Sequence, residues 1–228
     1  MNYTFTGEMK RFNGIIVNRI KYDNGLRGGW IEKEENLSKD GECQVLGEAV
    51  ILQNAYVSGD AKVSGSAIVS GYASIRDHTK VYGSARIEGY AKIADDACIM
   101  DEVLVFGNAF IRGNARVYDH ARVCEDTQVS GNCIIMGHAK VYGSADIGED
   151  ARILDNAEVS GDAFVGGNAT VCGDAKVNGA AYIYDHALIS GRGHVHGDAF
   201  VGSSCRVYGY ADIQTGKFFK DESFYSYD

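Results

Sequence analysis

Residues 45–92 read VLGEAV ILQNAY VSGDAK VSGSAI VSGYAS IRDHTK VYGSAR IEGYAK when they are divided every six residues. The same period continues without insertion or deletion to residue 218, which makes 29 consecutive hexads. Position one is Val or Ile every time, position five is Ala in 22 hexads, and position three is Gly in 18 and Asp or Glu in 8. An α-helix repeats its apolar residues every three or four positions and an amphipathic strand every two. A period of six therefore predicts a short strand followed by a turn.

The residue types at each position support this interpretation. A β-branched residue at position one suits a strand and points inward, so positions six and two point outward. Gly, Asp, Asn and His at positions three and four tolerate a left-handed backbone, and Ala at position five fits inside the bend. Three such sides make a triangular coil of 18 residues, and successive coils hydrogen-bond at about 4.8 Å. Residues 18 apart are therefore expected to stack in columns.

This pattern resembles the hexapeptide-repeat family over residues 45–218, which are 174 of 228 residues. The resemblance implies an all-β, left-handed parallel β-helix of about ten triangular coils; the period alone predicts the stacked coil but not its hand. Residues 26–38, LRGGWIEKEENLS, look like the segment that precedes the first coil in YdcK-like bacterial proteins. Those proteins are often labelled transferases by analogy of fold.

The two ends of the chain lack the hexad. Residues 1–44 contain the strand-like stretch 12–22, with an earlier short strand around 3–6 to pair with it, and Trp30 is expected to cover the open end of the first coil. Residues 219–228 follow Phe218 as an aromatic tail. Because the open edges of a solenoid recruit other chains, we expect an N-terminal cap and a second cap formed by the tail.

Composition restricts the partners and the compartment. The chain has 228 residues, a prior for one domain, and a net charge of −9 that disfavours nucleic acid and anionic membranes. No run approaches 18 apolar residues, and the start, MNYTFTGEMK, does not read as a secretory signal. Six cysteines without a C-x-x-C pair are typical of packed thiols in a reducing compartment. We expect a cytoplasmic protein with no nucleic acid and no membrane partner.

One outward column is apolar at its centre. The first face carries, at position two of every third hexad, Leu46, Ser64, Tyr82, Met100, Tyr118, Met136, Leu154, Cys172, Ser190 and Tyr208. Cys98, Ile134 and Leu188 at position six widen the strip. Since single chains rarely expose such a strip, it is predicted to be a subunit interface, and relatives in the hexapeptide-repeat family imply a homotrimer. A small-molecule groove is the alternative for the same residues.

The other two faces differ from the first. The second carries the aromatic series Phe164, Tyr182, Phe200 and Phe218, whose rings are expected to cover strand glycines or receive the tail. The third is mostly charged and is expected to be solvated, and it includes His194, His196 and Asp212. His194 and His196 both point outward from one strand, which would suit adventitious metal binding, and no functional metal site is predicted.

The catalytic candidates are His120 and His138, which occupy one corner position on adjacent coils beside the apolar strip. The resemblance to hexapeptide acyltransferases implies that such a histidine deprotonates an acceptor that attacks an acyl thioester of coenzyme A. His120 is then the preferred base, His138 the alternative and Tyr118 a neighbouring wall. Against this, Asp-His also occurs at residues 77–78 and 185–186, which indicates that the pair serves to form the turn. In addition, no long loop interrupts the repeat to form a wall of an active site.

The primary prediction is a rigid trimeric scaffold or binding module without turnover. A coenzyme-A-dependent O- or N-acyltransferase with an intersubunit site is the alternative, and its cofactor would be acetyl-coenzyme A or another acyl-coenzyme A. A third hypothesis is a protein that sequesters a small ligand between subunits. No phosphate-binding loop, serine-hydrolase motif or zinc-protease motif is present.

Overall fold

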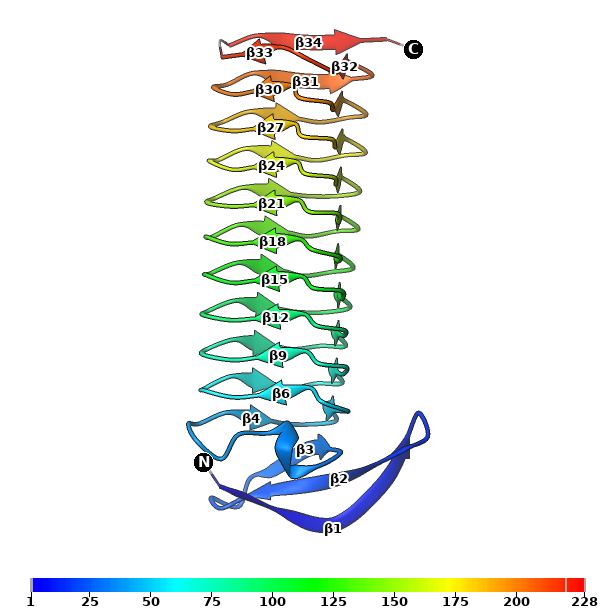
Figure 1. The fold of residues 1–228 in the computed structure, drawn as a ribbon, viewed down its shortest axis with the longest axis vertical. Coiled ribbons are helices and arrows are strands. Elements are labelled where there is room, and N and C mark those ends of the chain that lie inside the picture. The colour runs from blue at the N-terminus through cyan, green and yellow to red at the C-terminus, as the bar shows by residue number, and fades with distance from the viewer. Residues whose placement is uncertain (1, 220, 228) are drawn as a thin grey trace. The chain divides into compact units, whose positions relative to one another are not determined.

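The computed structural model describes residues 2–219 and 221–227, so Met1, Lys220 and Asp228, which belong to the predicted caps, lie outside the described residues. The chain divides into two compact units, Met1–Gly113 and Asn114–Asp228. Both units are all-β and contain a parallel solenoid in which strands 18 residues apart pair with one another, and the N-terminal strands of the first unit pair antiparallel (Figure 1). This confirms the predicted fold class, and the spacing fits a left-handed β-helix.

The first unit begins with three longer strands and a short 3-10 helix: β1 (Tyr3–Phe12), β2 (Ile15–Tyr22), β3 (Arg27–Ile31) and η1 (Glu34–Asn36). Two-residue strands follow: β4 (Gln44–Val45), β5 (Val50–Ile51), β6 (Tyr56–Val57), β7 (Lys62–Val63), β8 (Ile68–Val69), β9 (Ser74–Ile75), β10 (Lys80–Val81), β11 (Arg86–Ile87), β12 (Lys92–Ile93), β13 (Cys98–Ile99), β14 (Leu104–Val105) and β15 (Phe110–Ile111). Within this unit the strand orders are β4-β7-β10-β13, β6-β9-β12-β15 and β1-β2-β3-β5-β8-β11-β14.

The second unit repeats the same two-residue strand: β16 (Arg116–Val117), β17 (Arg122–Val123), β18 (Gln128–Val129), β19 (Ile134–Ile135), β20 (Lys140–Val141), β21 (Asp146–Ile147), β22 (Arg152–Ile153), β23 (Glu158–Val159), β24 (Phe164–Val165), β25 (Thr170–Val171), β26 (Lys176–Val177), β27 (Tyr182–Ile183), β28 (Leu188–Ile189), β29 (His194–Val195) and β30 (Phe200–Val201). It ends with β31 (Arg206–Gly209), β32 (Asp212–Ile213), β33 (Lys217–Phe218) and β34 (Ser223–Ser226). The orders are β16-β19-β22-β25-β28-β31-β34, β17-β20-β23-β26-β29-β32 and β18-β21-β24-β27-β30-β33.

Position one and position five of the hexad build the core of each coil. Val141 and Ala139, for example, have no exposed surface, and Val141 lies in register with Val123 and Val159. Aliphatic side chains stacked in this way remove apolar area from water at every coil. The core therefore consists of columns in which Val and Ile can replace one another, and its stability does not depend on any one residue.

Position three turns the corner with a left-handed backbone. Gly131 has φ of 76°, and a side chain there would begin 2.5 Å from the Glu149 carbonyl oxygen of the next coil. Where an acidic residue replaces glycine, its carboxylate compensates. Glu149 has φ of 56° and its Oε2 accepts a 2.9 Å hydrogen bond from the Gly167 amide, one coil on. The acidic residues at position three thus serve the turn rather than chemistry.

The N-terminal strands attach to the first coil through β3, which pairs in parallel with β5. Ile31 lies opposite the inward Ile51, whereas Trp30 lies opposite Val50 and packs with it and Leu52 on the outer face. The expectation that Trp30 covers the open end is therefore wrong, because neighbouring residues of a strand point to opposite sides. Tyr22, 1% exposed, fills the inner position, where its hydroxyl accepts a 2.6 Å hydrogen bond from the Val45 amide.

A shortened coil changes the register at the C-terminal end of the second unit. Phe200 lies opposite Lys217 and Val201 opposite Phe218, so the spacing is 17 residues instead of 18. A one-residue slip reverses the side to which a side chain points. Phe218 therefore takes an inward register, where its ring contacts Phe224 edge to face at 4.7 Å between centroids. The two rings cover the end of the aliphatic core, and β34 extends the sheet beyond β31.

All six cysteines are thiols, and Cys43, Cys133 and Cys205 are buried. Burial raises the pKa of Cys133 to about 12, so this thiol stays protonated near neutral pH. Among the described residues, no helix has the length and apolar character required to cross a membrane.

Candidate functional site

His120 and His138 lie in the second unit with their rings stacked, as their spacing predicts. The ring centroids are 4.8 Å apart, the planes differ by 6°, and both residues are exposed. The neighbouring carboxylate of Asp119 accepts a 3.0 Å hydrogen bond from the Gly137 amide, so it supports the turn of the next coil. The pair offers two solvent-accessible imidazoles on one corner, and imidazole is the side chain most often used as a general base.

The predicted apolar strip is divided between the two units. Tyr82 and Met100 lie in the first unit, and Tyr118, Met136 and Leu154 lie in the second. All five side chains are half-buried within the single chain. The strip is therefore apolar but less exposed than a column of isolated side chains would be.

The aromatic series on the second face forms as predicted except at its last member. Phe164 and Tyr182 stack at 4.5 Å, and Tyr182 and Phe200 stack at 4.7 Å. The Phe164 ring lies over Gly166, where a Cβ atom would come within 2.6 Å of it. Phe219, not Phe218, meets Phe200, at 4.7 Å between centroids, as a result of the slipped register. This face is thus covered by self-packing and by the start of the tail.

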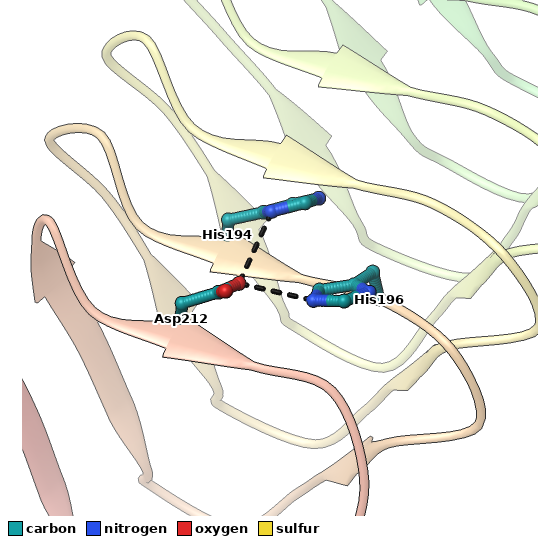
Figure 2. A group of neighbouring side chains, drawn as sticks. All are labelled: His194, His196 and Asp212. Carbon is teal, nitrogen blue, oxygen red and sulfur yellow. Dashed lines mark ion pairs between the residues drawn. The ribbon is translucent and has the colours of Figure 1, made fainter.

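A third group brings together side chains from the end of the second unit (Figure 2). Asp212 Oδ1 lies 3.1 Å from Nδ1 of His194 and 3.1 Å from Nε2 of His196. His194 and Asp212 are register partners on β29 and β32, and His196 follows β29 on the same outward side. The two imidazole rings stack with centroids 4.3 Å apart. These three ligand atoms all lie within 4.8 Å of one another.

The environment of this cluster is partly desolvated. The side chain of His196 is 23% exposed and that of His194 34%, whereas Asp212 is 64% exposed. Burial, followed by the neighbouring His196, lowers the pKa of His194, and the Asp212 carboxylate opposes that shift. On its other side, His194 Nε2 lies 3.0 Å from the amide nitrogen of Asn178.

Sequence reasoning placed His194, His196 and Asp212 on one face but did not group them. The signal was present, because Asp212 follows His194 by 18 residues. It also missed Tyr72 and Tyr90, an exposed pair on a corner of the first unit whose rings stack at 4.9 Å with the same spacing. In addition, Tyr210–Ile213 and Ser223–Ser226 line an open cavity of about 470 Å³ at the end of the second unit.

Comparison of the chain with models of known protein families and with curated proteins gives no match.

Proposed function

We propose that this chain is a rigid β-helical scaffold that assembles into a homotrimer and binds a partner or small ligand without turnover. The observation that carries the proposal is the regularity of both units. From β4 to β31, every strand follows its predecessor after a turn of the same length, and no segment in this range leaves the coil to wall a pocket. A structure made of repeated backbone hydrogen bonds and filled columns holds its surface side chains in fixed register.

Membership in the hexapeptide-repeat family, in the neighbourhood of the YdcK-like proteins, is part of this proposal. It is supported by the 18-residue spacing and the buried Val, Ile and Ala columns. The first-face strip then supplies the subunit contact, with Tyr118 and Met136 at its centre in the second unit. The side chains of Tyr118 and Met136 are half-buried in the single chain, and their remaining exposed surface would be buried in the trimer.

The oligomeric state tests the scaffold proposal directly. We expect native mass spectrometry of the purified chain to give a trimer, and Tyr118→Glu with Met136→Glu to give a monomer because two charges are desolvated at the contact. Arg122→Glu, a charge change on the third face, is the matched control and should leave the trimer intact. A monomeric wild-type protein, or an assembly unaffected by the double substitution, contradicts the proposal.

A coenzyme-A-dependent acyltransferase is the second candidate. The observation that favours it is the exposed stacked pair of His120 and His138, next to Tyr118 of the strip. Titration of the trimer with acetyl-coenzyme A separates the candidates. Saturable binding at about one coenzyme per subunit contact, with turnover lost in His120→Ala or His138→Ala, would establish the enzyme. A co-purified ligand without turnover would favour sequestration, and a trimer that ignores the coenzyme would leave the scaffold.

A further inference from the structure

We propose that His194, His196 and Asp212 form a binding site for a divalent transition-metal ion, and that Zn²⁺ is the ion their donor set fits best. This inference is independent of the proposed scaffold function, because all three residues lie on the third face of the coil, whereas the subunit contact is assigned to the first face. It also departs from the expectation that the two histidines bind metal only adventitiously. The carboxylate of Asp212 supplies a third ligand beside the two imidazoles, which the expectation from the two histidines did not include.

The spacing of the donor atoms is the first argument. Zn²⁺ binds imidazole nitrogen and carboxylate oxygen at about 2.0–2.2 Å, so two ligands of a tetrahedral ion lie about 3.4 Å apart. Asp212 Oδ1 is 3.1 Å from a ring nitrogen of each histidine. As Figure 2 shows, the Asp212 carboxylate lies between the two histidines and faces both of them from the adjacent strand, and the three ligand atoms lie within 4.8 Å of one another. A small outward movement of Asp212, which is on the exposed side, would admit the ion.

The rigidity of the positions is the second argument. His194 begins β29 and His196 directly follows it, so the two histidines flank the fully buried Val195 and both point outward. Asp212 is held opposite His194 by the parallel pairing of β29 with β32, in which the His194 amide donates a 2.8 Å hydrogen bond to the Ala211 carbonyl. Binding therefore requires little ordering of the backbone, which lowers its entropic cost.

Asn178 supplies an outer partner of the kind that metal-binding histidines use. Its side-chain amide lies 3.0 Å from His194 Nε2, the ring nitrogen opposite the proposed ligand atom. In the tautomer of His194 that carries its proton on Nδ1, toward Asp212, Nε2 accepts a hydrogen bond from the Asn178 NH₂. In the tautomer that would bind an ion through Nδ1, the ring proton lies on Nε2, and the Asn178 side chain with its amide flipped would accept a hydrogen bond from Nε2–H through its oxygen. One residue thus serves both states.

The surrounding charge permits a cation. Lys176 on β26 is the register partner of His194 on the side of the sheet away from Asp212. Its ammonium group forms an ion pair with Glu158, with Nζ 3.6 Å from Oε2. Glu158 also pairs with Lys140 at 2.7 Å, so this neighbouring group is a compensated ion network. Three protein ligands leave the fourth position of a tetrahedral ion open on the solvent side for water or a small oxyanion.

The experiment uses the full chain, freed of any purification tag and treated with a chelator, and titrates it with Zn²⁺ by calorimetry. We expect one ion per chain in the wild type. His196→Ala, His194→Ala and Asp212→Asn should each weaken binding by about 100-fold, and Asn178→Leu by about 10-fold. Co²⁺ serves as a second probe, because visible absorption of the intensity typical of a tetrahedral ion should appear in the wild type and vanish in His196→Ala.

The double variant His120→Ala, His138→Ala is the matched control, since it removes another stacked imidazole pair of the same unit. It should bind Zn²⁺ as the wild type does. Melting temperatures measured without metal verify that each variant folds. The proposal is overturned if the wild type shows no saturable binding, if the control loses as much affinity as His196→Ala, or if folded His194→Ala, His196→Ala and Asp212→Asn variants retain wild-type affinity.

Discussion

The N-terminal strands and the repeated coils are stabilised by different kinds of contact. In the coils, buried Val, Ile and Ala side chains recur in columns, and a position that is Val in one coil is Ile in another, as with Val117 and Ile135. In the N-terminal strands, the guanidinium of Arg19 donates to the Gly28 and Gly47 carbonyls at 3.0 and 2.6 Å and to Glu48 Oε1 at 2.7 Å. The coil depends on a residue class, whereas the cap depends on individual residues.

The cap network also includes Trp30. Arg19 lies over its ring at 4.1 Å and Lys10 at 4.2 Å, and its indole N–H donates a 2.9 Å hydrogen bond to Glu48 Oε2. Glu48 belongs to the first hexad, so these contacts attach β1, β2 and β3 to the first coil. A coil should therefore stay folded when one apolar residue replaces another and unfold when a charge is buried in it, whereas the cap should lose stability when one polar side chain is removed.

The largest effect is expected from a charge placed in a coil. Val141→Asp buries an unpaired carboxylate between Val123 and Val159 and should lower the free energy of unfolding by about 5 kcal/mol or more. Thermal melting followed by circular dichroism measures the loss. Arg122→Asp, at an outward position of the neighbouring strand, is the control and should melt within a few degrees of the wild type. Equal melting of both variants would contradict the inward assignment.

A smaller loss is expected when the central residue of the cap is removed. Arg19→Ala should destabilise the protein by about 3 kcal/mol, since it breaks an ion pair and leaves two carbonyls and the Trp30 face without their partner. Arg27→Ala removes an exposed pair with Glu8 and should cost about 0.5 kcal/mol. Denaturant unfolding, with Trp30 fluorescence as the probe of the cap, compares the two. Similar losses for both arginines would show that the network contributes little.

The smallest effect is a pH dependence at Glu48. Hydrogen bonds from Lys10, Arg19 and Trp30 lower the pKa of Glu48 from 4.5 to about 2. A folded-state pKa below the unfolded value contributes stability that is complete above about pH 4.5 and is lost as the pH falls toward 2. The carboxylate is half-exposed, so solvent screens the effect. Melting temperatures of the wild type should fall more steeply over this range than those of Glu48→Gln, and parallel curves would exclude Glu48 as the source.

Much of the coil could be predicted from the sequence, and the candidate sites only in part. Because the period is unbroken, the stacking of His120 on His138 and of Phe164 on Tyr182 follows from their 18-residue separation. The prediction was wrong for Trp30 and for Phe218, which lie at the two ends of the repeat. At these ends the six-residue period no longer predicts which residues pair. The last coil is one residue shorter than the others, and this turns Phe218 inward.

The period, the inward and outward positions and the partners in each column follow from the amino-acid sequence, because in a constant repeat residues a fixed number of positions apart become neighbours in space. The contacts between side chains of one face follow only from the folded chain. Asp212 was already in the column of His194, yet only the strand geometry directs its carboxylate to both imidazoles and sets Asn178 behind one of them. Such contacts depend on rotamers and on the partly desolvated surface around them, and a repeat of residue types does not specify either.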